Sequence, residues 1–438
     1  MPYLRLTPLA FLAALSVQTL AAEPHPNWQI GSNGEPSTAT RLEALTAESY
    51  SPSRGYGFEY KTDVETVSTP FGQGLHLKGP AVFSVEAPEG GYRVELEFYG
   101  SENASPITIK TEARRLNALN VQPEPLKLTT IDFTAHLRQI GLKDGGTVKL
   151  KSREIGGWHW DDRLQIEINS SDATLVSIRI TQDNTLPVIY IIGDSTLTDQ
   201  REEPWVGWGQ MLPLFFQPDV VIANYAESGL SFSSFKAQRR LDKILDTIKP
   251  GDFALIQFGH NDQKEKGDGI GPWQSYTEYI HEYVGAIRAH GAHPILVTPM
   301  KRRRFDEAGR QFKSLGDYPL AVRKAAADLS VPLIDLNYMS GVFYAALGPQ
   351  DSTKAFVHYP AHTFPGQDKP LKDDTHFNAY GGYELARCIV EGLKLLSPEL
   401  ALRLKPDYPT FDPAEPDAPE SLAIPSSPVS SVEKPDGN

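Results

Sequence analysis

The stretch Val188-Ile-Tyr-Ile-Ile192, followed by Gly193-Asp-Ser195, decides the fold of this chain. A run of apolar, mostly β-branched residues is typical of a strand buried on both faces, and such strands belong to parallel sheets. Gly193 then permits a sharp turn, which places the Ser195 hydroxyl just beyond the end of the strand. A hydroxyl in that position has the geometry of an activated nucleophile, although Gly-Asp-Ser is also a common composition for an ordinary turn.

Downstream of Pro187, short apolar runs alternate with amphipathic segments. This alternation is typical of an α/β domain, in which helices connect parallel strands by right-handed crossovers. We therefore predict an α/β domain with a parallel sheet over residues 186–402. The predicted strands are Val188–Ile192, Val220–Asn224, Phe253–Phe258, Pro294–Thr298 and Leu333–Asp335, and the predicted helices include Phe235–Ile248, Ser275–His290, Tyr318–Leu329 and Ala379–Leu396.

Residues 23–185 show a different pattern, in which apolar and polar residues alternate along short segments. The run Tyr92–Phe98 is one example, and Leu164–Ile168 is another. Period-2 alternation between turns rich in Gly, Pro and Asp predicts an antiparallel, all-β sandwich. Within it, the cluster Trp158-His-Trp160-Asp-Asp162 predicts either a platform that contacts sugar or a polar seam against the α/β domain, and we favour the seam.

Both ends of the chain have a distinct composition. Residues 1–22 combine Arg5, an apolar run and small residues before Ala22, which predicts a secretory signal peptide. No later run is apolar and long enough to span a bilayer, so we expect an exported protein that does not engage a membrane. Pro, Ser, Asp and Glu dominate residues 403–438, and we expect this tail to be disordered.

Composition excludes some classes of function. A length of 438 residues with 40% hydrophobic residues supports two domains with real cores. The net charge of -13 argues against a nucleic-acid partner but says nothing for or against a sugar ligand. Cys388 is the only cysteine, so the chain forms no internal disulfide, and the helical pattern around it predicts a core position.

The predicted strand ends carry chemistry. Ligands of open α/β sheets bind beyond the carboxyl ends of the strands. Those positions hold Ser195, Gly229, Asn261 and, before the last helix, Asp373-Asp374-Thr-His376. Ester hydrolysis needs a nucleophile, a base, a group that orients the base, and donors for the oxyanion. Each residue alone has an ordinary explanation as a turn, core or surface residue, but their joint occurrence at strand ends indicates an esterase.

The roles follow from the residue types. His376 would take the proton of Ser195, while a carboxylate on Asp373 or Asp374 would hold the other imidazole nitrogen; spacing alone leaves that choice open. The N–H groups of Ser195 and Gly229 and the side-chain amide of Asn261 would receive the oxyanion.

The blocks of residues at these strand ends resemble a known family, the SGNH hydrolases, also called GDSL esterases. The matching blocks are Gly193-Asp-Ser195, Gly229, Gly259-x-Asn261-Asp262 and Asp373-x-x-His376. Phe258-Gly-His-Asn-Asp-Gln-Lys264, Val297-Thr-Pro299, Gly316-Asp-Tyr-Pro319 and Asp373-x-Thr-His-Phe-Asn378 further resemble the rhamnogalacturonan acetylesterases. This likeness covers Val188 to about Leu396, and the upstream region resembles the galactose-binding-like β domain of some bacterial members.

The resemblance implies a flavodoxin-like, three-layer α/β/α SGNH domain. It also implies Ser195 as nucleophile, His376 as base and Asp373 as its partner, with Ser195, Gly229 and Asn261 as oxyanion donors. The family needs neither a metal nor another cofactor, and the sequence contains no Cys/His spacing typical of a metal site.

Five further residues are candidates for substrate binding. Arg302 and Arg303 follow a predicted strand end and could hold galacturonate carboxylates, or they could form a solvated patch paired with Asp306 and Glu307. Trp205 and Trp208 could stack on sugar or lie in the core. His260, next to Asn261, is the fifth candidate.

The sequence therefore predicts a secreted carbohydrate esterase that removes acetyl groups from a pectic polysaccharide, with rhamnogalacturonan favoured. One alternative keeps the chemistry and changes the ester, to acetylxylan, a lipid or a thioester. The other alternative is a carbohydrate-binding protein without catalysis. The sequence leaves the oligomeric state unknown.

Overall fold

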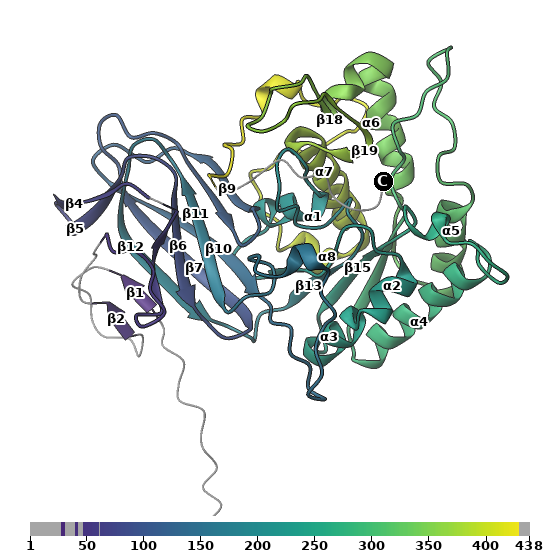
Figure 1. Cartoon of the computed structure of the whole chain (residues 1–438), viewed down its shortest axis with the longest axis horizontal. Helices are drawn as coiled ribbons and strands as arrows, with labels where there is room; N and C mark the ends of the chain where they lie inside the picture. Colours follow the sequence, from purple (N-terminus) through teal and green to yellow (C-terminus); the bar gives the residue numbers. More distant parts are fainter. Residues whose placement is uncertain (1–27, 31–39, 43–46, 61, 429–438) are drawn as a thin grey trace, which may run out of the picture.

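The computed structural model describes residues 28–30, 40–42, 47–60 and 62–428. Figure 1 shows a β-rich half built from the first part of the chain and an α/β half built from the second. The predicted signal peptide, residues 1–22, lies outside the described residues. In the part of the chain that is described, no helix is both long and apolar enough to cross a bilayer.

Residues up to Gln182 form two β sheets that pack face to face. One sheet has the order β10-β7-β12-β1-β2, with β5 and β4 beside β12, and the other has the order β3-β6-β11-β8-β9. Alternate residues of β7, such as Leu96 and Phe98, are buried in the core between the sheets, as the period-2 pattern predicts. The strands are β1 (Trp28–Ile30), β2 (Thr40–Leu42), β3 (Tyr56–Glu59), β4 (Val64–Thr69), β5 (Gly72–Leu77), β6 (Ala81–Glu86), β7 (Gly90–Tyr99), β8 (Ile107–Thr111), β9 (Arg115–Val121), β10 (Leu128–Leu137), β11 (Arg163–Asn169) and β12 (Ala173–Gln182).

The second half is a three-layer α/β/α domain around a parallel sheet of order β14-β13-β15-β16-β17. Its strands are β13 (Val188–Gly193), β14 (Val221–Asn224), β15 (Phe253–Gln257), β16 (His293–Val297) and β17 (Leu333–Ile334). A hairpin of β18 (Phe356–Tyr359) and β19 (Leu371–Phe377) precedes the last long helix. The helices are α1 (Trp208–Met211), α2 (Phe232–Ala237), α3 (Arg240–Thr247), α4 (Ser275–Ala289), α5 (Tyr318–Leu329), α6 (Leu336–Asp351), α7 (Ala379–Leu396) and α8 (Pro398–Ala401).

Strand β13 is buried on both faces, as its sequence predicts. Ile189 and Ile191 pack into the core with α1, α6 and α7, whereas Tyr190 and Ile192 pack into the opposite core with α2 to α5. Helices therefore cover both faces of the sheet (Figure 1), and the carboxyl ends of the strands remain for ligands. The predicted fold class is confirmed.

One expectation about the α/β half is wrong. The predicted helix Phe235–Ile248 is two helices, because Arg239 adopts a left-handed conformation with φ of 62° between α2 and α3. Its guanidinium pairs with Asp242, three positions later, and with Asp144, a distant contact that no local pattern indicates. The helix α6 was not among the predicted helices.

The expected disorder of residues 403–438 is also wrong for the part up to residue 428. Leu404 and Phe411 are buried, and the Tyr408 ring lies 4.8 Å from the ring of Phe215. The segment then crosses to the β sandwich, where Ser427 donates a hydrogen bond of 2.5 Å to Glu167. Sparse apolar anchors hold this extended segment, and its prolines lower the entropy lost on ordering. Residues 429–438 lie outside the described residues.

The cluster at Trp158 lies partly in the seam and partly at the surface. The His159 ring lies 2.7 Å from the backbone oxygen of Asp199, and the Trp160 ring lies 5.8 Å from the ring of Tyr225, so both form the buried seam with the α/β domain. Trp158 is partly exposed, and its indole N–H donates to the hydroxyl of Tyr60 at 3.2 Å. The seam is thus confirmed for His159 and Trp160.

Candidate active site

The Ser195 turn is built on a close approach between two strands. A Cβ at position 193 would lie 2.4 Å from the backbone oxygen of Gln257 on β15, so only glycine fits there. Beyond it, Asp194 accepts hydrogen bonds from the backbone N–H and the hydroxyl of Thr196, at 2.9 and 2.7 Å. The turn holds Ser195 at the end of β13 with only 2% of its surface exposed.

The hairpin strand β19 brings His376 to Ser195, which lies 181 positions earlier in the chain. His376 Nε2 lies 2.8 Å from Ser195 Oγ, and His376 Nδ1 lies 2.8 Å from Asp373 Oδ2. The second oxygen of Asp373 accepts the backbone N–H groups of Thr375 and His376 at 2.9 and 3.0 Å. These contacts form the hydroxyl–imidazole–carboxylate series that serine esterases use.

The structure separates the two neighbouring carboxylates. Asp374 points away from His376 and pairs with Arg303 at 2.7 Å and with His358 at 2.9 Å. Burial acts to raise the pKa of Asp373, but the hydrogen bond and charge of His376 outweigh it, together with the two N–H donors, and hold that pKa well below its ordinary value. Asp373 is therefore ionised at neutral pH, as a group that orients an imidazole must be.

The predicted oxyanion donors lie on the loops that follow β13, β14 and β15. Gly229 has a φ of 75°, a conformation that favours glycine. The Asn261 side-chain amide donates one hydrogen bond, of 2.9 Å, to the backbone oxygen of Leu230, the residue after Gly229. This bond leaves the second N–H of the amide for a ligand. Within the described residues, the backbone N–H groups of Ser195 and Gly229 have no hydrogen-bond acceptor. The role of these three groups in catalysis stays a prediction.

The prediction that Trp205 and Trp208 bind sugar is wrong. They are 2% and 0% exposed, and Trp208 packs in the core on the α7 side of the sheet. The indole of Trp208 donates to Gln257 at 3.1 Å. A stacking residue must present a ring face to solvent, whereas these rings fill the interior beneath the Ser195 turn.

Arg303 is also removed from the predicted substrate-binding residues. Its guanidinium donates to Asp374, to the hydroxyl of Ser352 at 3.0 Å and to the carbonyl of Pro349 at 2.5 Å. These contacts commit its charge to Asp374 on β19 and to the end of α6, so its alternative pairing with Asp306 and Glu307 is wrong as well; Asp306 pairs with Arg310.

Arg302 lies near Asp373, and His260 lies near His376. Arg302 donates to the backbone oxygen of His260 at 3.2 Å, and burial lowers the pKa of its guanidinium. The buried His260 ring lies 3.4 Å from Asp194 and is also affected by the charge of His376; its pKa is lowered chiefly by burial. Their predicted contact with substrate stays a prediction.

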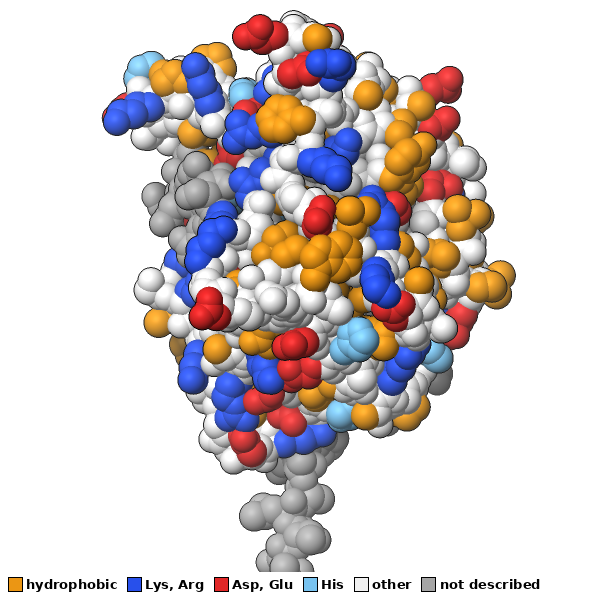
Figure 2. Space-filling model, turned by 90° about the vertical axis from the view of Figure 1, so that its right-hand side faces the viewer, with side chains coloured by type: hydrophobic (Ala, Val, Ile, Leu, Met, Phe, Trp, Pro, Cys, Tyr) orange, Lys and Arg blue, Asp and Glu red, His pale blue; other side chains and the backbone are white. Residues whose placement is uncertain are grey.

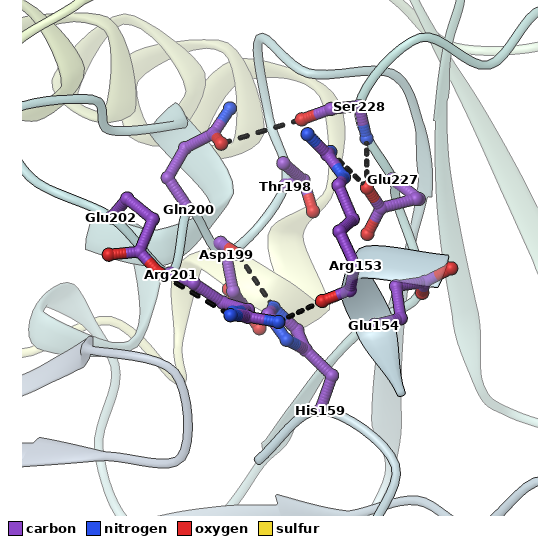
Figure 3. A pocket seen from close by; sticks show the side chains of 10 residues that line it. All are labelled: Arg153, Glu154, His159, Thr198, Asp199, Gln200, Arg201, Glu202, Glu227 and Ser228. Carbon is purple, nitrogen blue, oxygen red and sulfur yellow. Dashed lines mark hydrogen bonds and ion pairs between the residues drawn. The ribbon is translucent and has the colours of Figure 1, made fainter. Parts of the chain in front are cut away.

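Sequence reasoning missed a set of charged side chains at the seam between the two halves. Figure 3 shows a small cavity there, lined by Arg153, Glu154 and His159 of the sandwich and by residues 198–202, 227 and 228 of the α/β domain. Beside this cavity Asp199 pairs with Arg115 of β9 at 2.6 Å, with both side chains buried. Because Arg115 and Asp199 are 84 positions apart, no local pattern in the sequence indicates their contact. Among the described residues, no group of three or more His, Cys, Asp or Glu is arranged to hold a metal ion.

Comparison with known proteins places residues 191–382 in the GDSL-like Lipase/Acylhydrolase family. Rhamnogalacturonan acetylesterase RhgT of Bacillus subtilis (strain 168) is 40% identical over 219 residues, which cover 50% of this chain and 92% of that protein. The probable rhamnogalacturonan acetylesterase YesY of the same organism is 33% identical over 211 residues, 48% of this chain and 93% of that protein. The uncharacterized esterase YxiM of that organism is 26% identical over 369 residues, 80% of this chain and 85% of that protein.

Proposed function

Because the chain belongs to the GDSL-like lipase/acylhydrolase family and is an ester hydrolase, we propose that it removes acetyl groups from a pectic polysaccharide, rhamnogalacturonan. The observation that carries the proposal is the hydrogen-bonded series Ser195–His376–Asp373 at the end of the central strand. Two relatives named rhamnogalacturonan acetylesterases, matched over more than nine tenths of their length, support the choice of substrate.

The reaction proceeds through an acetyl-enzyme. Ser195 Oγ bonds to the ester carbonyl carbon while its proton moves to His376 Nε2. The carbonyl oxygen becomes an oxyanion that accepts hydrogen bonds from Ser195, Gly229 and Asn261. His376 then gives its proton to the departing sugar oxygen, and the carbon–oxygen bond to the sugar breaks. Water repeats the sequence on the acetyl-serine and releases acetate, while Asp373 stabilises each imidazolium form.

The depth of Ser195 supports a small acyl group. A nucleophile that is only 2% exposed is reached by a short acetyl group more readily than by a branched or bulky acyl chain. This feature favours an acetylesterase over a lipase within the same chemistry.

The distribution of charge is compatible with an acidic polymer. Figure 2 shows lysine and arginine side chains spread among acidic and apolar ones over the face that lies on the right in Figure 1. The net charge of -13 therefore does not produce a uniformly negative surface on this face. A polysaccharide rich in galacturonate can approach it without general repulsion.

Acetate release from three polymers tests the choice of substrate. We expect the highest kcat/KM on acetylated rhamnogalacturonan, and lower values on acetylated homogalacturonan and acetylxylan, with Ser195→Ala as the inactive control. A preference for acetylxylan would keep the mechanism and reject the proposed polymer. Activity that survives in Ser195→Ala would reject the mechanism itself.

Export of the protein is part of the proposal, on the strength of residues 1–22 alone. Expression of the full chain in a bacterial host should give a processed protein outside the cytoplasm, with an amino terminus near residue 23. An unprocessed amino terminus on protein retained in the cytoplasm would contradict it.

A further inference from the structure

The β sandwich reaches the loop that carries the proposed oxyanion glycine. A short 3₁₀ turn, Ser152–Glu154, lies at the seam between the two halves. Its Glu154 carboxylate is buried, pairs with Arg240 of α3 and accepts the backbone N–H of Lys151 at 2.9 Å. The turn is thereby fixed against the α/β domain, and it presents Lys151 and Arg153 to residues 227 and 228.

Two contacts from this turn determine the conformation of the loop. Arg153 pairs with the carboxylate of Glu227, which in turn accepts the backbone N–H of Ser228 at 2.9 Å. Lys151 Nζ donates a hydrogen bond of 2.5 Å to the backbone oxygen of Ser228. Figure 3 shows Arg153, Glu227 and Ser228 joined in this way at the edge of the cavity.

The bond to Ser228 matters because of the peptide group it belongs to. The carbonyl of Ser228 and the N–H of Gly229 are parts of one planar trans peptide, so they point in opposite directions. A donor that fixes the carbonyl on one side therefore fixes the N–H on the other. Gly229, with a φ of 75°, has the backbone freedom to let this peptide rotate when the donor is absent.

We propose that Lys151 of the β sandwich is a positioning residue that aims the Gly229 N–H at the oxyanion by holding the Ser228 carbonyl. The inference rests on the proposed function, since it assumes that Gly229 stabilises the oxyanion. It gives the β sandwich a part in catalysis, because a residue of that half sets the geometry of a donor in the other.

The test compares three variants on a small acetyl ester. Lys151→Met removes the donor, and we expect kcat to fall about tenfold to a hundredfold, with KM within about twofold, because a misplaced oxyanion donor acts on the transition state. Lys151→Arg restores a donor and should recover most of the lost kcat. Inactivation of Ser195 by a serine-directed phosphonate should slow in the same proportion, since its phosphoryl oxygen occupies the same position.

The matched control is Lys243→Met. Lys243 also crosses the seam, donating to the backbone oxygen of Gly141 at 2.6 Å and pairing with Glu89 at 2.6 Å, but it contacts neither residue 228 nor residue 229. This variant should lose thermal stability and retain its kcat. A Lys151→Met protein with wild-type kcat would overturn the inference. A fall in kcat no larger than the fraction of unfolded protein would overturn it as well. If Ser195→Ala were also fully active, the proposed function itself would fail.

Discussion

Two buried histidines contact the segment from Ser195 to Gln200 at different points, and their surroundings differ. At the strand ends, the ring of His376 lies between Asp373 and the Ser195 hydroxyl. At the seam, the ring of His159 contacts the backbone oxygen of Asp199, while burial and the nearby charge of Arg138 lower its pKa to about 3. The comparison teaches that burial alone does not make a base: a histidine needs a carboxylate that stabilises its charged form and a proton to accept.

Replacing each histidine in turn tests this contrast, and it carries the largest expected effect. His376→Asn should lower kcat by about 10⁶, roughly 8 kcal/mol, as loss of the base does in a serine hydrolase. His159→Asn should lose stability but keep kcat. Steady-state kinetics and thermal melts of both variants provide the measurement, and a comparable loss of kcat in the two would erase the distinction.

The seam itself can be broken at Arg115. Arg115→Met leaves the carboxylate of Asp199 buried without its cation, and we expect a loss of about 3–5 kcal/mol in the free energy of unfolding. Denaturant titration measures it. The double variant Arg115→Met/Asp199→Asn should recover part of the loss, because the uncompensated charge is gone. A single variant as stable as the wild type would show that the pair is not formed.

On the active-site side, Asn261→Ala sharpens the comparison. Removing one oxyanion donor should lower kcat by about 10²–10³, or 2.7–4 kcal/mol, with the fold intact. Lys266 in the same loop donates to the backbone oxygen of Gln263 at 3.1 Å and not to Asn261, so Lys266→Ala is a neighbouring control that should change kcat little. Near wild-type kcat in a folded Asn261→Ala protein would remove Asn261 from the mechanism.

The last effect depends on pH and concerns Asp262, which follows Asn261 in the same loop. Burial raises the pKa of its carboxyl to about 7, above the unfolded value of about 3.9. Because the pKa is higher in the folded state, the folded protein binds a proton at Asp262 more tightly than the unfolded chain does. The contribution of this proton to the free energy of unfolding is complete below pH 4 and is lost as pH rises toward 7.

Asp262→Asn should remove this pH dependence of the free energy of unfolding, whose slope is at most about 1.4 kcal/mol per pH unit. Unfolding free energies measured from pH 4 to 8 for the wild type and the variant would reveal it. Parallel curves would show that Asp262 is already ionised in the folded protein.

Local sequence patterns were sufficient to predict the parallel sheet and the candidate site residues at the ends of its strands. Val188–Ile192 predicts a central strand, and the shared edge of such a sheet places Ser195 and Asn261 on loops that follow the neighbouring strands β13 and β15. Spacing left the choice between Asp373 and Asp374 open, and the family resemblance favoured Asp373. In the structure the N–H groups of Thr375 and His376 hold the Asp373 carboxylate beside the imidazole.

Contacts between distant segments could not be predicted. Lys151 and Ser228 are 77 positions apart, and neither carries a signature of its role. Trp205 and Trp208 were misread because an aromatic residue near a nucleophile has the same sequence signal whether it lines a cleft or fills a core. The carboxyl-terminal segment has a composition typical of disorder, yet a few buried side chains such as Phe411 hold it to the α/β domain.

The central claim is that Ser195 is the nucleophile, and the covalent intermediate tests it most directly. The full chain would be treated with a serine-directed phosphonate and the labelled peptide located by mass spectrometry. We predict one adduct per chain, on Ser195, with activity lost in step with labelling and no adduct in Ser195→Ala. Full inactivation with the adduct on another residue, or an unlabelled enzyme that still releases acetate, would contradict it.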